Sequence, residues 1–244
     1  MAKKVIEIQG LNFYYPDSTH ALKNIALDIF EGESVGVIGP NGAGKSTLLL
    51  HLNGILRGDN HIKLFDMEIS DKALPLIRKK VGVVFQDPNN QLFMPTVFDD
   101  VAFGPLSMGL SKDEVNRAVN EALREVDMLD CVNRSSHHLS SGQKKRVSLA
   151  TVLSMRPDIL VLDEPSSDLD PKHRRDLIAI LKRLSATKII ATHDLDLVLE
   201  VCSRVVLLNA GRVVVTAAAM EVFSNRQLLE ENDLGIPIAL CKAG

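Results

Sequence analysis

The sequence predicts an α/β fold that is interrupted by a helical insertion. Residues 34–38 form an apolar run ending in glycine, typical of a central strand, and a helical pattern follows over residues 45–55. Residues 159–162 form a second apolar run, which ends in two carboxylates. Between about residues 96 and 155 the apolar positions recur mostly at helical spacing, so we expect a group of helices between two parts of an α/β core.

Other segments of the first half extend this pattern. Residues 25–29 alternate apolar with polar or small side chains, which predicts a half-buried strand, and residues 81–85 form a β-branched run. Ser111 and Glu114 have the spacing of a capping box at the start of a helix. The helix that follows has one apolar face. Its members are Val115, Ala118, Val119, Ala122, Leu123 and Val126.

The second half returns to the α/β alternation. Residues 172–184 predict a helix and residues 188–191 predict a strand. Two further strands, residues 205–208 and 212–215, flank Asn209-Ala210-Gly211, which is a hairpin signal. The final stretch carries no clear pattern. The chain has no internal repeat, low-complexity tract or obvious linker.

The composition excludes several classes of protein. Hydrophobic residues make up 45% of the 244 residues and charged residues 24%, as in ordinary soluble globular proteins. Aromatic residues are only 4%, which argues against a broad stacking surface for bases or sugars. The net charge of -3 provides no strong positive field for nucleic acid, so no nucleic-acid partner is expected.

Membrane and metal-binding signals are also missing from the sequence. No run approaches the roughly 18 apolar residues of a membrane span, and the first residues lack the apolar core of a signal peptide. We therefore expect a soluble, cytosolic chain. Cys131, Cys202 and Cys241 are odd in number and far apart, which fits neither a disulfide framework nor a zinc site.

A glycine-rich segment predicts a nucleotide phosphate site. Residues 39–46, GPNGAGKS, match the pattern G-x-x-x-x-G-K-[ST] between a predicted strand and a predicted helix. Glycines allow backbone N–H groups to face phosphate oxygens, and the helix N-terminus adds positive potential. Lys45 would bind the outer phosphates and the Ser46 hydroxyl would bind Mg²⁺. The expected nucleotide contacts of this segment, the P-loop, are Gly39, Pro40, Asn41, Gly42, Ala43, Gly44, Lys45, Ser46 and Thr47.

The two carboxylates after residues 159–162 are the expected acidic partners of the P-loop. Asp163 suits a water-mediated contact to Mg²⁺, and Glu164 is placed to polarise an attacking water. A buried strand that ends in acids is common by itself. Beside a P-loop the same pair is specific for nucleotide hydrolysis.

Residues 139–143, LSSGQ, lie between these two motifs at the start of a predicted helix. A plain serine–glycine cap would explain this segment if it stood alone. In this order with the P-loop and the Asp-Glu pair, it resembles the signature sequence of ATP-binding-cassette (ABC) ATPases. In that family the signature of one subunit closes over the ATP in the other subunit's P-loop. The resemblance implies ATP contacts from Ser140, Gly142 and Gln143.

Further positions match family elements one by one. Gln86 corresponds to the Q-loop glutamine, which contacts Mg²⁺ and water and senses the membrane partner, and residues 167–170 correspond to the D-loop. His193 corresponds to the switch histidine that contacts the γ-phosphate. Tyr15 corresponds to the aromatic residue that stacks on adenine, although Tyr14 beside it leaves the register open. The chain departs from the family pattern at Ser141, where glycine is usual, and at Asp168, where a small residue is usual.

Residues 86–93, with residues 95–97 and 100–105, indicate the branch of the family. They resemble the ATPases of energy-coupling-factor transporters, which include cobalt and nickel importers and vitamin uptake systems. A second glutamine is characteristic of that group, and it corresponds here to Gln91, whose role stays open. The aspartate usual in that group is replaced by Asn89 or Asn90.

The resemblance implies one nucleotide-binding domain over residues 1–244. Its P-loop NTPase core, with an antiparallel β subdomain, would span about residues 1–86 and 157–224. An inserted α-helical subdomain would span about 87–156, and a short C-terminal extension 225–244. The implied protein hydrolyses ATP with Mg²⁺ as a homodimer or heterodimer, on integral membrane subunits at the cytoplasmic face of the membrane.

Two other functions were weighed against the importer subunit. A soluble ABC ATPase of DNA repair or translation usually has a long coiled-coil insertion or two fused cassettes, and this chain has neither. The basic clusters at residues 144–146 and 172–175 are interpreted as solvated helix surface. A non-hydrolysing, ATP-gated interaction module would not need Glu164 and His193. The sequence does not identify the cargo.

Overall fold

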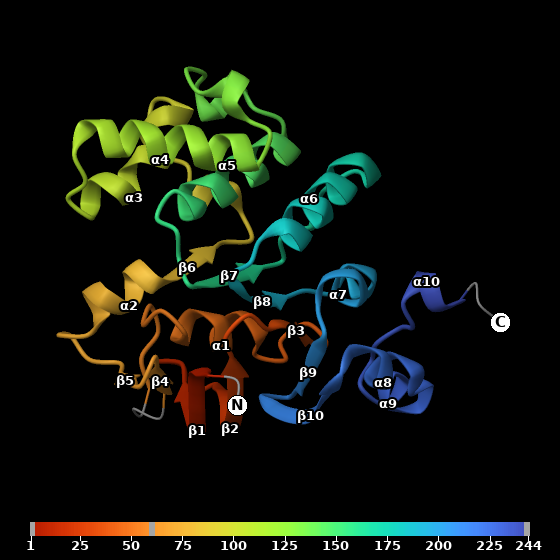
Figure 1. Cartoon of the computed structure of the whole chain (residues 1–244). Helices are drawn as coiled ribbons and strands as arrows, with labels where there is room; N and C mark the ends of the chain where they lie inside the picture. Colours follow the sequence, from red (N-terminus) through yellow and green to blue (C-terminus); the bar gives the residue numbers. More distant parts are fainter. Residues whose placement is uncertain (1–2, 59–61, 242–244) are drawn as a thin grey trace.

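The computed structural model describes residues 3–58 and 62–241 (Figure 1). Its larger sheet consists of β3 (Ser34–Ile38), β6 (Val81–Val84), β7 (Ile159–Asp163), β8 (Thr187–Ala191), β9 (Arg204–Asn209) and β10 (Arg212–Ala218). The strand order is β10-β9-β3-β8-β7-β6, and every pairing is parallel except that of β10 with β9. The apolar runs predicted as central strands are β3 and β7, which have helices on both faces of their sheet.

A smaller antiparallel sheet covers one side of this core. It consists of β1 (Lys4–Tyr14), β2 (His20–Phe30), β4 (Ile62–Leu64) and β5 (Met67–Glu68), in the order β2-β1-β4-β5. The predicted alternation lies in β2, where Ile25 and Ile29 are fully buried in one cluster with Leu48 of the following helix. The two sheets and the inserted helices confirm the predicted fold class.

The remaining elements are helices. Around the sheets lie α1 (Lys45–His51), α2 (Leu74–Lys80), α6 (Pro171–Arg183), α7 (Leu195–Val201), α8 (Ala219–Ser224), α9 (Arg226–Glu231) and α10 (Ile238–Cys241). The inserted group, called the helical lobe below, consists of α3 (Val97–Ser107), α4 (Lys112–Glu125) and α5 (Ser141–Leu153), at the top of Figure 1. Short 3₁₀ turns lie at Pro88–Asn90, Leu129–Cys131 and Ser136–His138. Among the described residues, no helix is long and apolar enough to cross a lipid bilayer.

The helical lobe has its own core and packs directly on the sheet. The predicted apolar face of α4 is buried along its whole length, and Glu114 accepts a hydrogen bond from the Ser111 N–H at 2.8 Å in the capping box. On the sheet side, a Cβ at Gly82 of β6 would lie 2.1 Å from Cγ1 of Val152 on α5. Glycine at that position therefore lets α5 approach β6 closely.

Some predicted boundaries differ from the structure. Helix α1 ends at His51 instead of residue 55, because Gly54 turns the chain with a φ of +69° and lies against Leu74 of α2.

The predicted hairpin joins β9 and β10, and Ala210 and Gly211 both have positive φ, as in a type I′ turn.

The final stretch, which had no clear pattern, completes the core. Leu229 of α9 is fully buried in the same hydrophobic cluster as Phe223 of α8. The Asn209 amide donates a hydrogen bond to Asn232 Oδ1 at 2.9 Å, which fastens this region to the end of β9. Residues 242–244 of the predicted extension lie outside the described residues. Cys131, Cys202 and Cys241 are all free.

Candidate active site

One cleft gathers most of the predicted nucleotide contacts. Because β3, β6, β7 and β8 are parallel, the segments that follow them meet at one edge of the sheet. The cleft at this edge has a volume of about 760 Å³. The predicted site residues that line it are Tyr15, Asn41, Gly42, Ala43, Gly44, Lys45, Ser46, Thr47, Gln86, Glu164 and His193.

Some contributions to the cleft had no signal in the sequence. Thr19, His20, Ala21 and Lys23 line it from the start of β2, and Ala210 and Gly211 from the β9–β10 hairpin. They reach it through the packing of the small sheet and the hairpin beside the P-loop, where Lys23 N–H donates to Gly211 O at 2.7 Å. No motif marks these positions, because only the tertiary arrangement of the elements brings them there.

The P-loop requires its glycines. Gly39, Gly42 and Gly44 all have positive φ, at 150°, 78° and 103°. A Cβ on Gly39 would lie 2.0 Å from the Leu208 carbonyl oxygen, and one on Gly44 would lie 2.8 Å from that of Ala21. The loop therefore keeps its path between β3 and α1 only with glycine at these positions.

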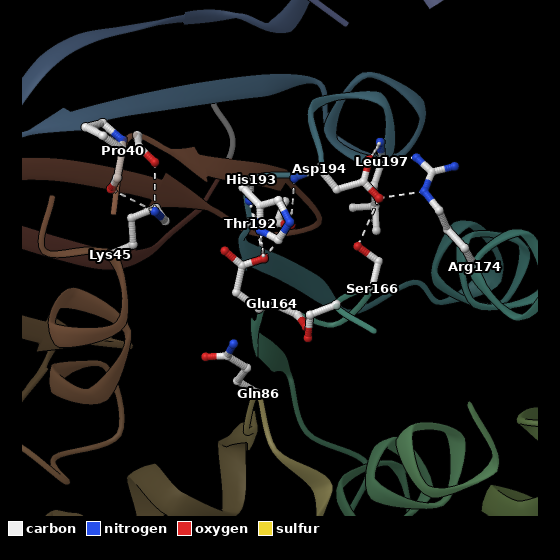
Figure 2. Close-up of polar contacts among 12 residues, drawn as sticks. Pro40, Lys45, Gln86, Glu164, Ser166, Arg174, Thr192, His193, Asp194 and Leu197 are labelled. Atoms are coloured by element: carbon white, nitrogen blue, oxygen red, sulfur yellow. Dashed lines mark hydrogen bonds and ion pairs between the residues drawn. The ribbon is translucent and has the colours of Figure 1, made fainter. Parts of the chain in front are cut away.

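Lys45 lies inside the P-loop with its ammonium group buried. Its Nζ donates hydrogen bonds to the Gly39 carbonyl at 2.7 Å and the Pro40 carbonyl at 3.1 Å (Figure 2). Burial lowers the pKa of Lys45, and the nearby carboxylates of Glu164 and Asp163 partly oppose this change. Phosphate oxygens in the loop would compete with the two carbonyls for the same ammonium group.

Asp163 carries a buried carboxylate oxygen with no protein partner. Its Oδ1 has no hydrogen bond within the described chain. Burial raises the pKa of Asp163, while a hydrogen bond with the Ser46 hydroxyl acts in the opposite direction. An unpartnered carboxylate oxygen close to a hydroxyl suits a hard cation such as Mg²⁺. No cluster of three His, Cys, Asp or Glu side chains that could hold a metal occurs in residues 3–58 and 62–241, and Mg²⁺ with phosphate ligands does not need one.

Glu164 is held by the strand beside it and by the segment that follows β8. Its N–H donates to the Ala191 carbonyl at 2.8 Å, in a left-handed conformation with φ of +44°. Its Oε2 accepts hydrogen bonds from Thr192 Oγ1 at 3.0 Å and His193 N–H at 3.3 Å, and it lies 2.8 Å from His193 Nδ1. Figure 2 shows this group facing the cleft between Lys45 and Gln86. The His193 side chain is 67% exposed, so it is free to turn toward a ligand.

Of the two neighbouring tyrosines, Tyr15 lines the cleft. Its hydroxyl forms a 2.9 Å hydrogen bond with Thr47 Oγ1, and its ring packs edge-on against Phe13. Tyr14 stacks instead on His20, with ring centroids 3.9 Å apart, and is exposed. This geometry favours Tyr15 as the adenine-stacking candidate.

The signature residues do not line the cleft of their own chain. At the start of α5, the Ser140 N–H donates to Gln143 Oε1 at 3.0 Å and the Gln143 N–H donates to Ser140 Oγ at 3.3 Å, a capping box. Gly142 is buried, and a Cβ there would lie 2.7 Å from the His173 ring. A complete nucleotide site therefore needs a second chain if these residues contact ATP. In the D-loop, Asp168 has a φ of +59°, a conformation that aspartate adopts more readily than most residues.

Gln91 lies away from the cleft and joins two elements. Its Oε1 accepts a hydrogen bond from the Phe85 N–H at 3.1 Å, at the end of β6. Its Nε2 donates to the Ser148 carbonyl at 2.8 Å and to Thr151 Oγ1 at 2.7 Å, both on α5. Gln91 thus ties the segment after β6 to the signature helix.

Replacing Gln91 with leucine is expected to lower the free energy of unfolding by about 1–3 kcal/mol, because the Phe85 N–H and the Ser148 carbonyl lose their partner. Urea denaturation of the purified chain measures this change. Gln227→Leu is the matched control, since the exposed Gln227 side chain forms one hydrogen bond within the described residues, to Glu231 one turn away. Equal stability of the Gln91 variant and the wild type would contradict the linking role.

Two basic side chains that were predicted to be solvated surface make specific contacts within the protein instead. Lys145, in the cluster 144–146, is buried and hydrogen-bonded to the segments around the site. Arg174, in the cluster 172–175, forms two 2.6 Å contacts with Asp194, which also accepts a hydrogen bond from Ser166 Oγ (Figure 2). The sequence held one signal that Lys145 would be buried. Lys145 follows Gly142 by three residues, so the two lie on the same face of α5, and that face is buried.

Comparisons with known proteins agree with this geometry. A family model described as ABC transporter matches residues 22–167. An energy-coupling factor transporter ATP-binding protein of Carboxydothermus hydrogenoformans is 51% identical over 237 residues, which cover 96% of this chain and 87% of the relative. The structure of cbiO1 from Clostridium perfringens, part of the ABC transporter complex cbiONQ, matches with a TM-score of 0.83 at 40% identity over 94% of both chains.

A dimeric structure adds information on assembly. The ATP-binding cassette MJ0796, solved as a dimer in a post-hydrolysis state bound to ADP and Pi, matches with a TM-score of 0.79 at 28% identity, over 88% of this chain and 98% of that one. The P-loop, the acidic pair and the signature predicted from the sequence thus occur in a chain with the fold of these ATPases. The chain belongs to the ABC transporter family and is an ATP-binding ATPase subunit of a transporter.

Proposed function

We propose that the chain is the motor subunit of an energy-coupling-factor importer, for cobalt, nickel or a vitamin. The observation that carries this proposal is the single cleft that joins the P-loop, Gln86, Glu164 and His193. The names of the similar proteins, an energy-coupling factor ATP-binding protein and a cbiO1 subunit, support the branch. No observation favours a role in DNA repair or translation, and the net charge of -3 argues against one.

In this proposal each of the predicted site residues has one task. Lys45 and the P-loop N–H groups bind the phosphates, Tyr15 stacks on adenine and His193 contacts the γ-phosphate. Glu164 orients a water and accepts its proton as the water attacks the γ-phosphorus and the bond to ADP breaks. Ser46, Gln86 and, through water, Asp163 would hold Mg²⁺, which neutralises phosphate charge when bound.

We further propose that two chains sandwich two ATP molecules. The signature residues 140–143 would complete the cleft of the other chain, since they lie outside their own. The inserted subdomain of about residues 87–156, which contains the helical lobe, would move as a unit when the dimer closes. Each chain carries a P-loop, Glu164, His193 and a signature, so a homodimer would have two complete sites, and a heterodimer with a related ATPase is also compatible.

Exposed apolar side chains on α3 and in the loop before it support a docking surface for the membrane subunits. Phe93, Phe103 and Leu106 are 62%, 48% and 57% exposed, and the two phenylalanine rings contact each other edge-on. Asp100 is buried, and its Oδ1 accepts the N–H groups of Phe93 and Met94 at 2.9 Å each. The loop that carries Phe93 is therefore fixed to α3, and docking there would place the chain at the cytoplasmic face of the membrane.

Replacing Phe103 with serine is expected to reduce co-purification with the integral membrane subunits of the transporter by about tenfold, because apolar contact area is lost. Leu76→Ser is the control, since Leu76 is similarly exposed but lies on α2. Equal recovery of the membrane proteins with both variants would contradict the docking surface.

ATP-driven uptake tests the proposed function as a whole. The chain would be reconstituted with those membrane proteins in vesicles, and entry of labelled cobalt, nickel or vitamin would be measured with and without MgATP. We expect entry of one of these cargoes to require MgATP and to stop with Glu164→Gln. Hydrolysis without association with any membrane protein would overturn the importer assignment.

A further inference from the structure

Lys145 joins two separate segments around the active site to α5. It lies on α5 and is only 6% exposed. Its Nζ donates hydrogen bonds to the Gln86 carbonyl at 3.0 Å, the Glu164 carbonyl at 2.9 Å and Ser167 Oγ at 2.7 Å. An ammonium group has three N–H donors, so each donor of Lys145 has its own acceptor, one after β6 and two in the connection after β7.

The hydrogen-bond acceptors of Lys145 belong to residues at or beside the proposed site of ATP hydrolysis. Gln86 lines the cleft after β6, Glu164 follows β7, and Ser167 lies in the D-loop. Ser167 Oγ and the Ser167 N–H also donate to the Glu164 carbonyl, at 2.9 and 3.2 Å, so this one oxygen receives three hydrogen bonds. Glu164 also has a left-handed backbone with φ of +44°, a strained conformation that persists only when surrounding contacts fix it.

Burial lowers the pKa of Lys145. The carboxylates of Asp168, Glu164, Asp87 and Asp163 attract its ammonium form and partly oppose this change. A buried charge costs much free energy when some of its hydrogen-bond donors have no acceptor. The acceptors around a buried ammonium group therefore tolerate only small displacements. Lys145 is therefore suited to fix positions instead of merely filling space.

We propose that Lys145 is a positioning residue for ATP hydrolysis. It ties the backbones of Gln86 and Glu164 to the signature helix of the same chain through hydrogen bonds. The catalytic carboxylate of one site and the signature that serves the other site are then directly connected, which links the two ATP sites of a dimer. This inference rests on the proposed role of Glu164, and Lys145 itself does not line the cleft.

The test separates turnover from nucleotide binding in the full chain. Lys145→Met is expected to lower kcat about 100-fold, since a displacement of about 1 Å at a reacting group costs about that much. The Kd for a fluorescent ADP analogue is expected to stay within about threefold, because the P-loop is untouched. Lys145→Gln keeps two N–H donors on a shorter side chain, so we expect its kcat to lie about tenfold below wild type.

Lys144→Met is the matched control. Lys144 is the preceding residue on α5. Within the described residues its Nζ donates one hydrogen bond, to Asn89 Oδ1 at 2.9 Å. We expect its kcat to stay within about twofold of wild type. A reduced kcat at unchanged Kd in Lys145→Met, with partial recovery in Lys145→Gln, supports positioning.

Several results would overturn the inference. The inference fails if the kcat of Lys145→Met lies within about threefold of the wild-type kcat. It also fails if this variant loses kcat and nucleotide affinity to the same extent. If Lys145→Met fails to fold, Lys145→Gln decides, and a wild-type kcat in that variant shows a role in folding alone. If Glu164→Gln hydrolyses ATP normally, the proposed catalytic role fails. If that variant is inactive while Lys145→Met is active, only the inference on Lys145 fails.

Discussion

Replacing Glu164 with glutamine is expected to lower ATP turnover by about 10²–10⁴-fold while ATP still binds. The amide is nearly the same size as the carboxylate, and its oxygen can still accept the hydrogen bonds from Thr192 Oγ1 and the His193 N–H. It cannot take a proton from the attacking water. The bound ATP would therefore persist and hold two chains together.

Two measurements check this expectation. Phosphate release gives the turnover, and size-exclusion chromatography with and without MgATP gives the dimer. We expect the Glu164 variant to elute as a dimer only with MgATP. Glu200→Gln is the control, since Glu200 does not line the cleft and contacts Lys182 in a partly exposed ion pair between α7 and α6. Near-wild-type phosphate release from the Glu164 variant would refute its role as the residue that polarises water.

The central strands were predictable because burial on both faces leaves a strong pattern. In β3 and β7 nearly every residue is buried, so the sequence there is a continuous apolar run. The parallel arrangement then places Lys45, Glu164 and His193 together, since each follows the carboxyl end of a strand. The main features of the cleft follow from two motifs and this one geometric rule.

The connections between elements were less predictable, because they depend on which side chains meet in space. Lys145 reads as part of a basic cluster, yet its acceptors come from residues 59, 19 and 22 positions away in the chain. Gln91 similarly finds its partners on α5. Helix α1 stops early because Gly54 meets Leu74, a contact that no local pattern contains. Periodicity identifies which face of a helix is buried but not the partner of a polar group on that face.

Lys45 is buried and hydrogen-bonded before any ligand binds. Its side chain is mostly removed from water, and its ammonium group is held by the carbonyls of Gly39 and Pro40. Little reorganisation is then needed when phosphate oxygens replace those carbonyls, and a preorganised charge in a buried site stabilises developing negative charge strongly. Lys45→Ala is therefore expected to lower both the affinity for MgATP and turnover by about 100-fold or more.

Thermal unfolding measures the loss of affinity without relying on turnover. At a MgATP concentration of 100 times the wild-type Kd, binding stabilises the folded chain by about 2.7 kcal/mol. A 100-fold weaker site gains only about 0.4 kcal/mol under the same conditions, so the rise in Tm should almost disappear. Lys182→Ala, on the outer side of α6, is the control and should keep the full rise. If MgATP raises the Tm of Lys45→Ala as much as that of the wild type, the phosphates do not bind at this loop.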